Sequence, residues 1–103
     1  MDKTEVIEKV RRFADLVSVE LPLKAVILFG SYAKGTERKD SDIDVAIVVK
    51  STDKAFSEYA PIIWRLRRKI DTLIEPVVVE ENNDPSGFLE EIYRTGIIVY
   101  PDN

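Results

Sequence analysis

Residues 25 to 49, from which the fold prediction follows, read AVILFGSYAKGTERKDSDIDVAIVV. Two apolar runs, Ala25 to Phe29 and Ile43 to Val49, enclose a polar segment with glycines at positions 30 and 35. Short runs that are apolar at nearly every position predict strands buried on both faces. The polar segment between them predicts a loop with room for one helical turn.

Upstream of this stretch, the spacing of apolar residues predicts an amphipathic helix. Either Thr4 or Asp2 can cap its start, and Pro22 marks its far limit. The apolar stripe recurs with a period near 3.6 residues and consists of Val6, Ile7, Val10, Phe13, Ala14 and Val17.

The second half of the chain continues this alternation. Residues 54 to 71 predict a helix that Pro61 should delay or kink. Residues 72 to 79 predict a third strand, and Pro76 places it at a sheet edge or at a bulge. After a turn at residues 82 to 85, Ser86 is the expected N-cap of a helix that Gly96 ends. Residues 97 to 100 predict a last short strand.

The predicted element order is therefore α-β-loop-β-α-β-α-β. It indicates an α/β (α+β) fold, with helices packed on a mixed sheet of about four strands. The 103 residues suit one domain, residues 1–103, with one hydrophobic core.

Composition excludes several kinds of chemistry. The sequence has no cysteine and no histidine, so thiolate zinc sites, thiol nucleophiles and imidazole bases are excluded. With 19 acidic and 15 basic residues the net charge is -4, and we expect no direct binding of nucleic acid. No apolar run is long enough to span a membrane. The first residues have no signal-peptide character, so we expect a cytoplasmic protein.

The most informative polar residues are two aspartates at the start of the second strand. Side chains two positions apart on a strand point the same way, so Asp42 and Asp44 should lie side by side, with Cα atoms roughly 6–7 Å apart. Pairs of carboxylates that would otherwise repel each other are typical of Mg²⁺ sites that also bind phosphate. The alternative is a solvated strand start, in which Asp40, Ser41 and Asp42 only form the turn.

A glycine-serine pair and a glutamate strengthen the metal-site interpretation. Gly30 and Ser31 follow a buried strand, where backbone amides and a hydroxyl can hold phosphate. Glu75 lies within the third strand among apolar neighbours and is our candidate third ligand or general base. Its alternative role is a charge that protects an edge strand from aggregation. Asp71 and Glu80 are weaker candidates because both lie at element ends.

Basic and aromatic residues admit two interpretations. Lys34 and Arg38 either neutralise a bound triphosphate or only solvate the loop. The exposed end of a helix better explains the cluster Arg65, Arg67, Arg68 and Lys69 than a binding patch does. Tyr32 is expected at the mouth of the cleft, whereas core or interface positions are expected for Phe56, Tyr59 and Trp64.

Together, Gly30-Ser31-Tyr32-Ala33-Lys34-Gly35 and Ser41-Asp42-Ile43-Asp44-Val45 resemble the signature of the DNA polymerase β-like nucleotidyltransferase superfamily. The resemblance covers essentially the whole chain, and its short length is similar to that of the minimal nucleotidyltransferases of bacteria and archaea. It implies the nucleotidyltransferase fold, with Mg²⁺ (two ions) bound by Asp42, Asp44 and Glu75. It also implies that a nucleoside triphosphate, ATP, contacts Gly30 and Ser31, and we place Lys34, Arg38 and Ser41 with them.

Minimal members typically act as the antitoxin of a toxin–antitoxin pair with a helical HEPN-type protein. The resemblance implies that this chain transfers AMP to a tyrosine of such a toxin, with the partner or a second copy completing the cleft. The competing hypothesis is a non-enzymatic module that neutralises a partner by binding it. A small scaffold with an accidental motif is a third interpretation, which the length of the motif disfavours.

Overall fold

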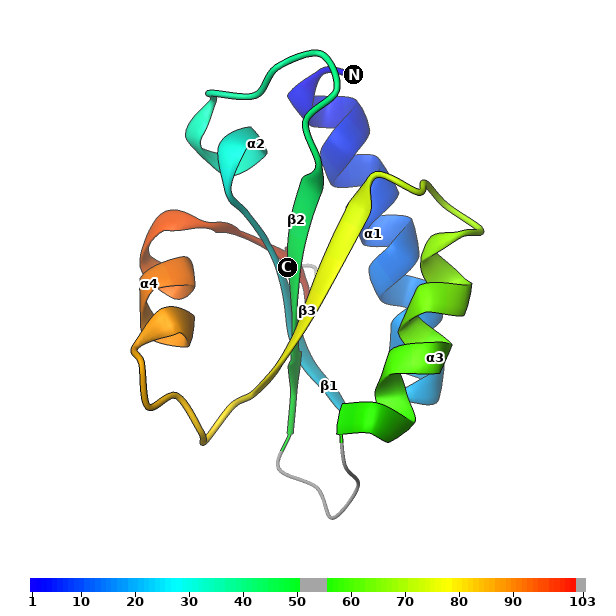
Figure 1. The fold of residues 1–103 in the computed structure, drawn as a ribbon, viewed down its shortest axis with the longest axis vertical. Coiled ribbons are helices and arrows are strands. Elements are labelled where there is room, and N and C mark those ends of the chain that lie inside the picture. The colour runs from blue at the N-terminus through cyan, green and yellow to red at the C-terminus, as the bar shows by residue number, and fades with distance from the viewer. Residues whose placement is uncertain (51–55, 102–103) are drawn as a thin grey trace.

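The chain folds into helices and strands in the predicted order. A computed structural model describes residues 1–50 and 56–101, and Figure 1 shows their arrangement. Residues 54 and 55, predicted to begin the third helix, and the side chain of Phe56 lie outside what it describes. The elements are α1 Lys3–Glu20, β1 Leu23–Phe29, α2 Ser31–Lys34, β2 Ile43–Val49, α3 Phe56–Arg67, β3 Ile74–Glu80, α4 Phe88–Thr95 and β4 Ile97–Tyr100.

The four strands form one mixed sheet in the order β3-β2-β1-β4. Strand β1 is antiparallel to both of its neighbours, β2 and β4, whereas β2 and β3 run parallel. Strand β3 therefore lies at an edge of the sheet, as Pro76 predicted. The predicted α+β fold with a mixed sheet of four strands is confirmed.

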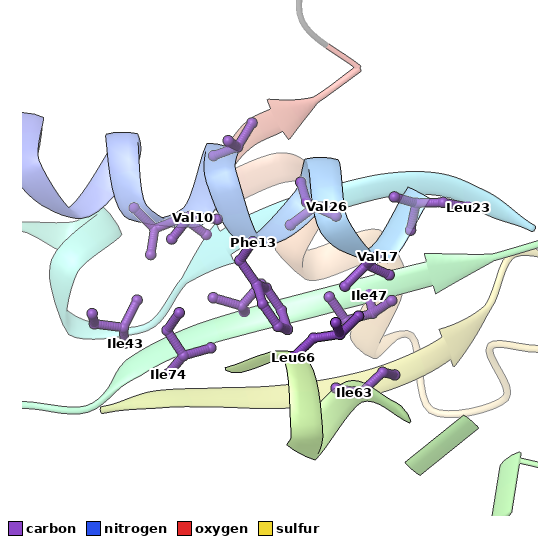
Figure 2. Close-up of a cluster of buried hydrophobic side chains, with 14 of the residues drawn as sticks. Val10, Phe13, Val17, Leu23, Val26, Ile43, Ile47, Ile63, Leu66 and Ile74 are labelled. Carbon is purple, nitrogen blue, oxygen red and sulfur yellow. The ribbon is translucent and has the colours of Figure 1, made fainter. Parts of the chain in front are cut away.

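Helices α1 and α3 cover one face of the sheet, which we call the α1–α3 face (Figure 1). The Asp2 carboxylate caps α1 by accepting a hydrogen bond from the Glu5 amide, so Asp2 rather than Thr4 is the cap. Phe13 points from α1 into the core that Figure 2 shows, and its side chain is fully buried. The strand residues of this core alternate along each strand and include Val26, Leu28, Ile43, Val45, Ile47 and Ile74.

Helix α4 packs on the opposite face, which we call the α4 face (Figure 1). Leu89 and Ile92 of this short helix contact the alternate strand residues Ala25, Ile27, Ala46 and Val48. The short α2 lies on the same side of the sheet, beyond one end of α4 (Figure 1).

Three local predictions about helix ends need correction. Ser86 does not cap α4, because Gly87 is the N-cap residue and the Asp84 carboxylate accepts hydrogen bonds from the Leu89 and Glu90 amides instead. A carboxylate reaching forward from the preceding turn satisfies these amides as a cap would. The third helix ends at Arg67 rather than residue 71. Pro61 lies inside it, so the predicted delay is wrong, whereas the alternative of a kink stays a prediction.

Candidate active site

Two of the predicted carboxylates are direct neighbours on the sheet. In the parallel pairing of β2 with β3, Asp44 lies opposite Glu75. Paired strands are about 4.8 Å apart, so these side chains lie next to each other. Both belong to the α4 face, because Ile43 and Ile74, the residues before them, are buried in the core of the other face. Phe29 of β1 pairs with Asp44 from the opposite side and continues this row.

Asp42, the third predicted carboxylate, is exposed just before β2. Its charge nevertheless reaches the pair. Burial raises the pKa of Asp44, and the negative charges of Asp42 and Glu75 raise it further. The fold therefore holds Asp44 in a place where a negative charge is disfavoured, which a bound cation would relieve.

The side chains themselves are not arranged as a finished metal site. Within residues 1–50 and 56–101, no three acidic side chains are grouped closely enough to hold one metal ion. These residues also enclose no pocket. A cation shared by the three carboxylates would have to draw the exposed Asp42 side chain toward Asp44 and Glu75.

Gly30 lies against the Asp44 carboxylate. A Cβ atom placed on Gly30 would stand 2.2 Å from Asp44 Oδ2 and 3.0 Å from its Cγ. The backbone of Gly30 also has a positive φ of 75° with ψ at -149°, a region that is essentially restricted to glycine. Glycine is therefore required here both to turn the chain from β1 into α2 and to leave room for Asp44.

The glycine-serine bend leads directly into the single turn of α2. The first hydrogen bond of this turn runs from the Lys34 amide to the Gly30 carbonyl. The amides of residues 31 to 33 precede that bond and point out of the start of the turn, as at any helix N-terminus. Ser31 is half-buried at this position, which lies beside the strand that carries Asp44.

The other predicted nucleotide contacts lie in the loop between α2 and β2. The side chains of Lys34 and Arg38 are exposed. The Ser41 hydroxyl accepts a hydrogen bond from the Arg38 amide at 2.7 Å, and the Ser41 amide donates to the Arg38 carbonyl. Ser41 thus closes the loop that leads to Asp42. Tyr32 is not at a cleft mouth as predicted, because its side chain is buried in the core of the α1–α3 face.

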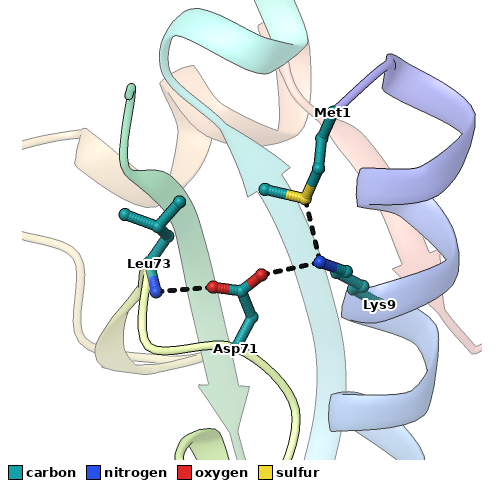
Figure 3. Close-up of polar contacts among 4 residues, drawn as sticks. All are labelled: Met1, Lys9, Asp71 and Leu73. Atoms are coloured by element: carbon teal, nitrogen blue, oxygen red, sulfur yellow. Dashed lines mark hydrogen bonds and ion pairs between the residues drawn. The ribbon is translucent and has the colours of Figure 1, made fainter. Parts of the chain in front are cut away.

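Asp71 has a structural environment rather than a place beside Asp44. Its carboxylate accepts hydrogen bonds from Lys9 Nζ at 2.7 Å and from the Leu73 amide at 2.8 Å (Figure 3). Burial alone would raise the pKa of Asp71, but these hydrogen bonds and the Lys9 charge lower it overall. Glu80, the other weak candidate, lies at the far end of β3, opposite Val49.

One residue of the basic cluster differs from the expected solvated helix end. Arg65, Arg68 and Lys69 are exposed, but Arg67 is half-buried. Its Nη1 donates to the backbone carbonyls of Thr72 and Ile74. Ile74 is the residue immediately before Glu75. The sequence carried no signal for this contact, since four basic residues in five positions look alike.

Comparisons with known proteins agree with the fold and with the family resemblance. The profile of the family described as "Polymerase beta, Nucleotidyltransferase" matches residues 12–103. A "Putative protein adenylyltransferase" of Methanocaldococcus jannaschii is 37% identical over 99 residues, covering 92% of this chain and 99% of the relative. A second protein of the same name and organism is 26% identical over 83 residues, covering 80% of this chain and 83% of the relative.

Solved structures give the same fold. A "putative nucleotidyltransferase" from Sulfolobus solfataricus superposes with a TM-score of 0.70 at 20% identity, covering 93% of this chain and 80% of the other. A structure described as a "toxin-antitoxin with AMP-PNP" has a TM-score of 0.57 at 20% identity and covers 100% of this chain and 76% of the other. A mutant of the toxin-antitoxin MntA-HpeT gives 0.56 at 19% identity, with the same coverage.

The structural matches establish the fold, and the profile and the sequence relatives establish the lineage. The helix predicted between the second and third strands is also present. None of the described helices is long and apolar enough to cross a membrane. The chain therefore belongs to the polymerase β nucleotidyltransferase family and is a nucleotidyltransferase related to protein adenylyltransferases.

Proposed function

We propose that this nucleotidyltransferase transfers AMP from ATP to a hydroxyl group of a protein partner, with Mg²⁺ bound by Asp42, Asp44 and Glu75. The observation that carries the proposal is the pairing of Asp44 with Glu75 directly beside the Gly30 bend. Two acidic side chains on the same face of adjacent strands are costly unless a cation is bound between them.

The donor set fits the metal. All three groups are carboxylates, and Mg²⁺ prefers oxygen ligands together with the phosphates of its substrate. The raised pKa of Asp44 reflects surroundings that disfavour its negative charge, and a bound cation would stabilise that charge. Asp42 is exposed and precedes the strand, so its side chain is free to turn toward the pair.

The triphosphate is assigned to the bend and the loop that follows it. The outward amides of residues 31 to 33 and the Ser31 hydroxyl can donate to phosphate oxygens. Lys34 and Arg38, both exposed in the same loop, can neutralise the outer phosphates. Ser41 keeps this loop closed through its hydrogen bond to the Arg38 amide and so positions both Arg38 and Asp42.

In the proposed reaction, the oxygen of the acceptor hydroxyl attacks the α-phosphorus of ATP. A new P–O bond forms, the bond between the α-phosphorus and the bridging oxygen breaks, and pyrophosphate leaves. Glu75 accepts the proton of the hydroxyl. Bound Mg²⁺ supplies charge neutralisation on the phosphates. Most of the acceleration comes from positioning and charge, as in other phosphoryl transfers.

The acceptor we propose is a tyrosine of a HEPN-type toxin, which makes this chain an antitoxin. The support comes from related proteins. Two relatives carry the name protein adenylyltransferase, and two structures of similar fold are toxin-antitoxin complexes, one of them with AMP-PNP. In the MntA-HpeT mutant, two aspartates two positions apart are replaced by glutamate, a spacing that Asp42 and Asp44 share.

The test is transfer of label from α-³²P-ATP to the partner that co-purifies with this chain from its native host. We expect Asp42→Asn and Asp44→Asn to reduce Mg²⁺-dependent labelling on the order of 10³-fold, because each removes charge needed in the transition state. Asp40→Asn is the matched control, since Asp40 is an exposed aspartate of the same loop. Mass spectrometry of the partner should find an added AMP on tyrosine.

Equal labelling by wild type and both variants would overturn the assignment of the site. If the variants lose labelling but still neutralise the partner, inhibition by simple binding replaces the antitoxin chemistry. An acceptor-free check is thermal melting with Mg²⁺ and ATP, because a ligand of the native state raises the midpoint. That increase should occur in wild type and Asp40→Asn and should be lost in Asp44→Asn.

A further inference from the structure

The strand that carries Glu75 has a neighbour on only one side. Among the described residues, strand β3 forms the edge of the sheet and pairs only with β2. The Ile43 amide donates to the Leu73 carbonyl at 2.8 Å, so that carbonyl points toward β2. Successive carbonyls along a strand point in opposite directions, and the Ile74 carbonyl therefore points away from β2 to the open edge. One residue before Glu75, the sheet itself thus provides no partner on this side.

Arg67 occupies this open edge. From the last position of α3, its Nη1 donates to the Ile74 carbonyl at 3.1 Å and also to the Thr72 carbonyl. The guanidinium also stacks over the ring of Trp64, with Cζ 4.1 Å from the ring centroid. Packing against an aromatic face and bonding to two carbonyls restrict the guanidinium to one orientation. The contact therefore fixes the start of β3 relative to α3.

Asp71 and Lys9 hold the turn just before β3. The Asp71 carboxylate accepts from the Leu73 amide and pairs with Lys9 of α1 (Figure 3). The Ile74 amide donates to the Asp71 carbonyl at 3.2 Å. Arg67 and Asp71 therefore both hold the backbone that leads into β3.

We propose that Arg67 is a positioning residue for the transfer reaction: by holding the Ile74 and Thr72 carbonyls, it keeps Glu75 directly opposite Asp44. Side chains alternate along a strand, so a slip of the β3 register by one residue would turn the Glu75 side chain to the other face. Arg67 acts through the backbone. It comes from the α1–α3 face, whereas the Glu75 side chain belongs to the α4 face. The inference rests on the proposed role of Glu75 and adds to it the reason why an edge strand can hold a ligand in place.

The test is a double-mutant cycle between Arg67 and Glu75 with Mn²⁺ as the probe. Electron paramagnetic resonance measures the Kd of Mn²⁺ for the full chain in the presence of α,β-methylene-ATP, which cannot be cleaved. We expect Arg67→Met to raise this Kd about 10-fold, as loss of a group supporting a ligand does. Arg67→Lys, which can reach only one carbonyl at a time, should give an intermediate value. Arg68→Met, an exposed neighbour of the same charge, should bind like wild type.

The cycle separates positioning from general destabilisation. If Arg67 acts through Glu75, then Arg67→Met should weaken Mn²⁺ binding no further once Glu75→Gln is already present. All samples are measured well below their melting midpoints, and Arg67→Lys replaces Arg67→Met in the cycle if the latter does not fold.

Two results would overturn the inference. One is wild-type Mn²⁺ binding by Arg67→Met, and the other is effects of Arg67→Met and Glu75→Gln that simply multiply. In either case a loss of binding in Glu75→Gln and Asp44→Asn would leave the proposed function intact. If those two variants bind Mn²⁺ like wild type, it is the proposed function itself that fails.

Discussion

The two faces of the sheet are built from the same strands but are used differently. On the α1–α3 face, Ile43, Val45 and Ile47 are fully buried beneath two long helices. On the α4 face, Asp44 lies between the first two of these residues and is only half-buried. The shorter α4 covers the middle of this face, while Val77 and Ile98 at its two edges remain exposed. We therefore expect the α1–α3 face to provide more of the stability, whereas the α4 face can carry charges that reduce it.

The strand register shows where charge lies on the α4 face. The row Glu75, Asp44 and Phe29 is followed on the α4 face by the row Val77, Ala46, Ile27 and Ile98, which is entirely apolar. Charge is confined to the end of the face nearest α2. The experiments below test whether the faces separate in this way, beginning with the largest effect.

Phe13→Ala should show how much stability the α1–α3 face holds. The ring is fully buried between α1 and the sheet, and replacing it leaves a cavity. We expect the free energy of unfolding to fall by about 3–5 kcal/mol. Urea denaturation followed by circular dichroism measures it. Val77→Ala, an exposed position of the α4 face, is the control and should change stability by less than about 0.5 kcal/mol. Equal losses at the two positions would contradict the comparison.

Gly30→Ala should damage both stability and the site. Its Cβ would overlap the Asp44 carboxylate, and alanine is strained at this φ and ψ, at a cost of about 1–3 kcal/mol. Gly35 provides a matched control because it also has a positive φ, but a Cβ added there would meet no described neighbour within 4 Å. Gly35→Ala should cost about 1 kcal/mol and keep the thermal shift with Mg²⁺ and ATP, which Gly30→Ala should lose. Retention of that shift by both variants would show that Asp44 adapts.

Asp44→Asn should stabilise the protein, in the absence of metal, at neutral pH. The pKa of Asp44 is raised in the folded state, so its ionisation destabilises the fold above that pKa and has no effect below the unfolded value. Removing the charge should add only about 0.5 kcal/mol, or roughly 2–4 °C in Tm, because solvent screens this half-buried group. The gain should disappear in acid as the pH falls below about 3.9. Melting curves of wild type and Asp44→Asn in EDTA, from about pH 3 to about pH 7, measure this difference in Tm.

Asp71→Asn is the control of opposite sign. The pKa of Asp71 is lowered overall, so its stabilisation is present above the unfolded pKa and is lost as pH falls through the folded one. Asp71→Asn should therefore lower stability at neutral pH, by about 1 kcal/mol. If both aspartate variants shift Tm in the same direction at pH 7, the two carboxylates do not differ as described.

Much of the fold followed from local sequence because periodicity reports which faces are buried. The α1 stripe and the two apolar strands that flank the bend were predicted with their positions nearly correct. Pro76 correctly indicated an edge strand because it cannot donate a ladder hydrogen bond. The prediction that Ser86 caps α4 was wrong because local sequence left the choice of cap open. Several residues of the turn could satisfy the first amides of α4, and only the path of the chain selected Asp84.

Among the candidate site residues, the positions that depend on local sequence could be predicted, and those that depend on packing could not. The spacing of Asp42 and Asp44 is a property of the chain itself, and the Gly30 bend could be recognised because only glycine tolerates such a conformation. Their roles in metal and nucleotide binding stay predictions. Tyr32 was misplaced because a residue beside a polar loop can still turn inward, and the four basic residues after Trp64 could not be told apart.

Local sequence specifies where strands, bends and acidic residues occur, because these depend on contacts and conformations within a few residues. The position of Glu75 opposite Asp44, and the contact of Arg67 with the start of β3, arise only when the whole chain packs. Strand register and the reach of a long side chain depend on segments that are distant in sequence. Their relative positions are set only when the two faces of the sheet pack.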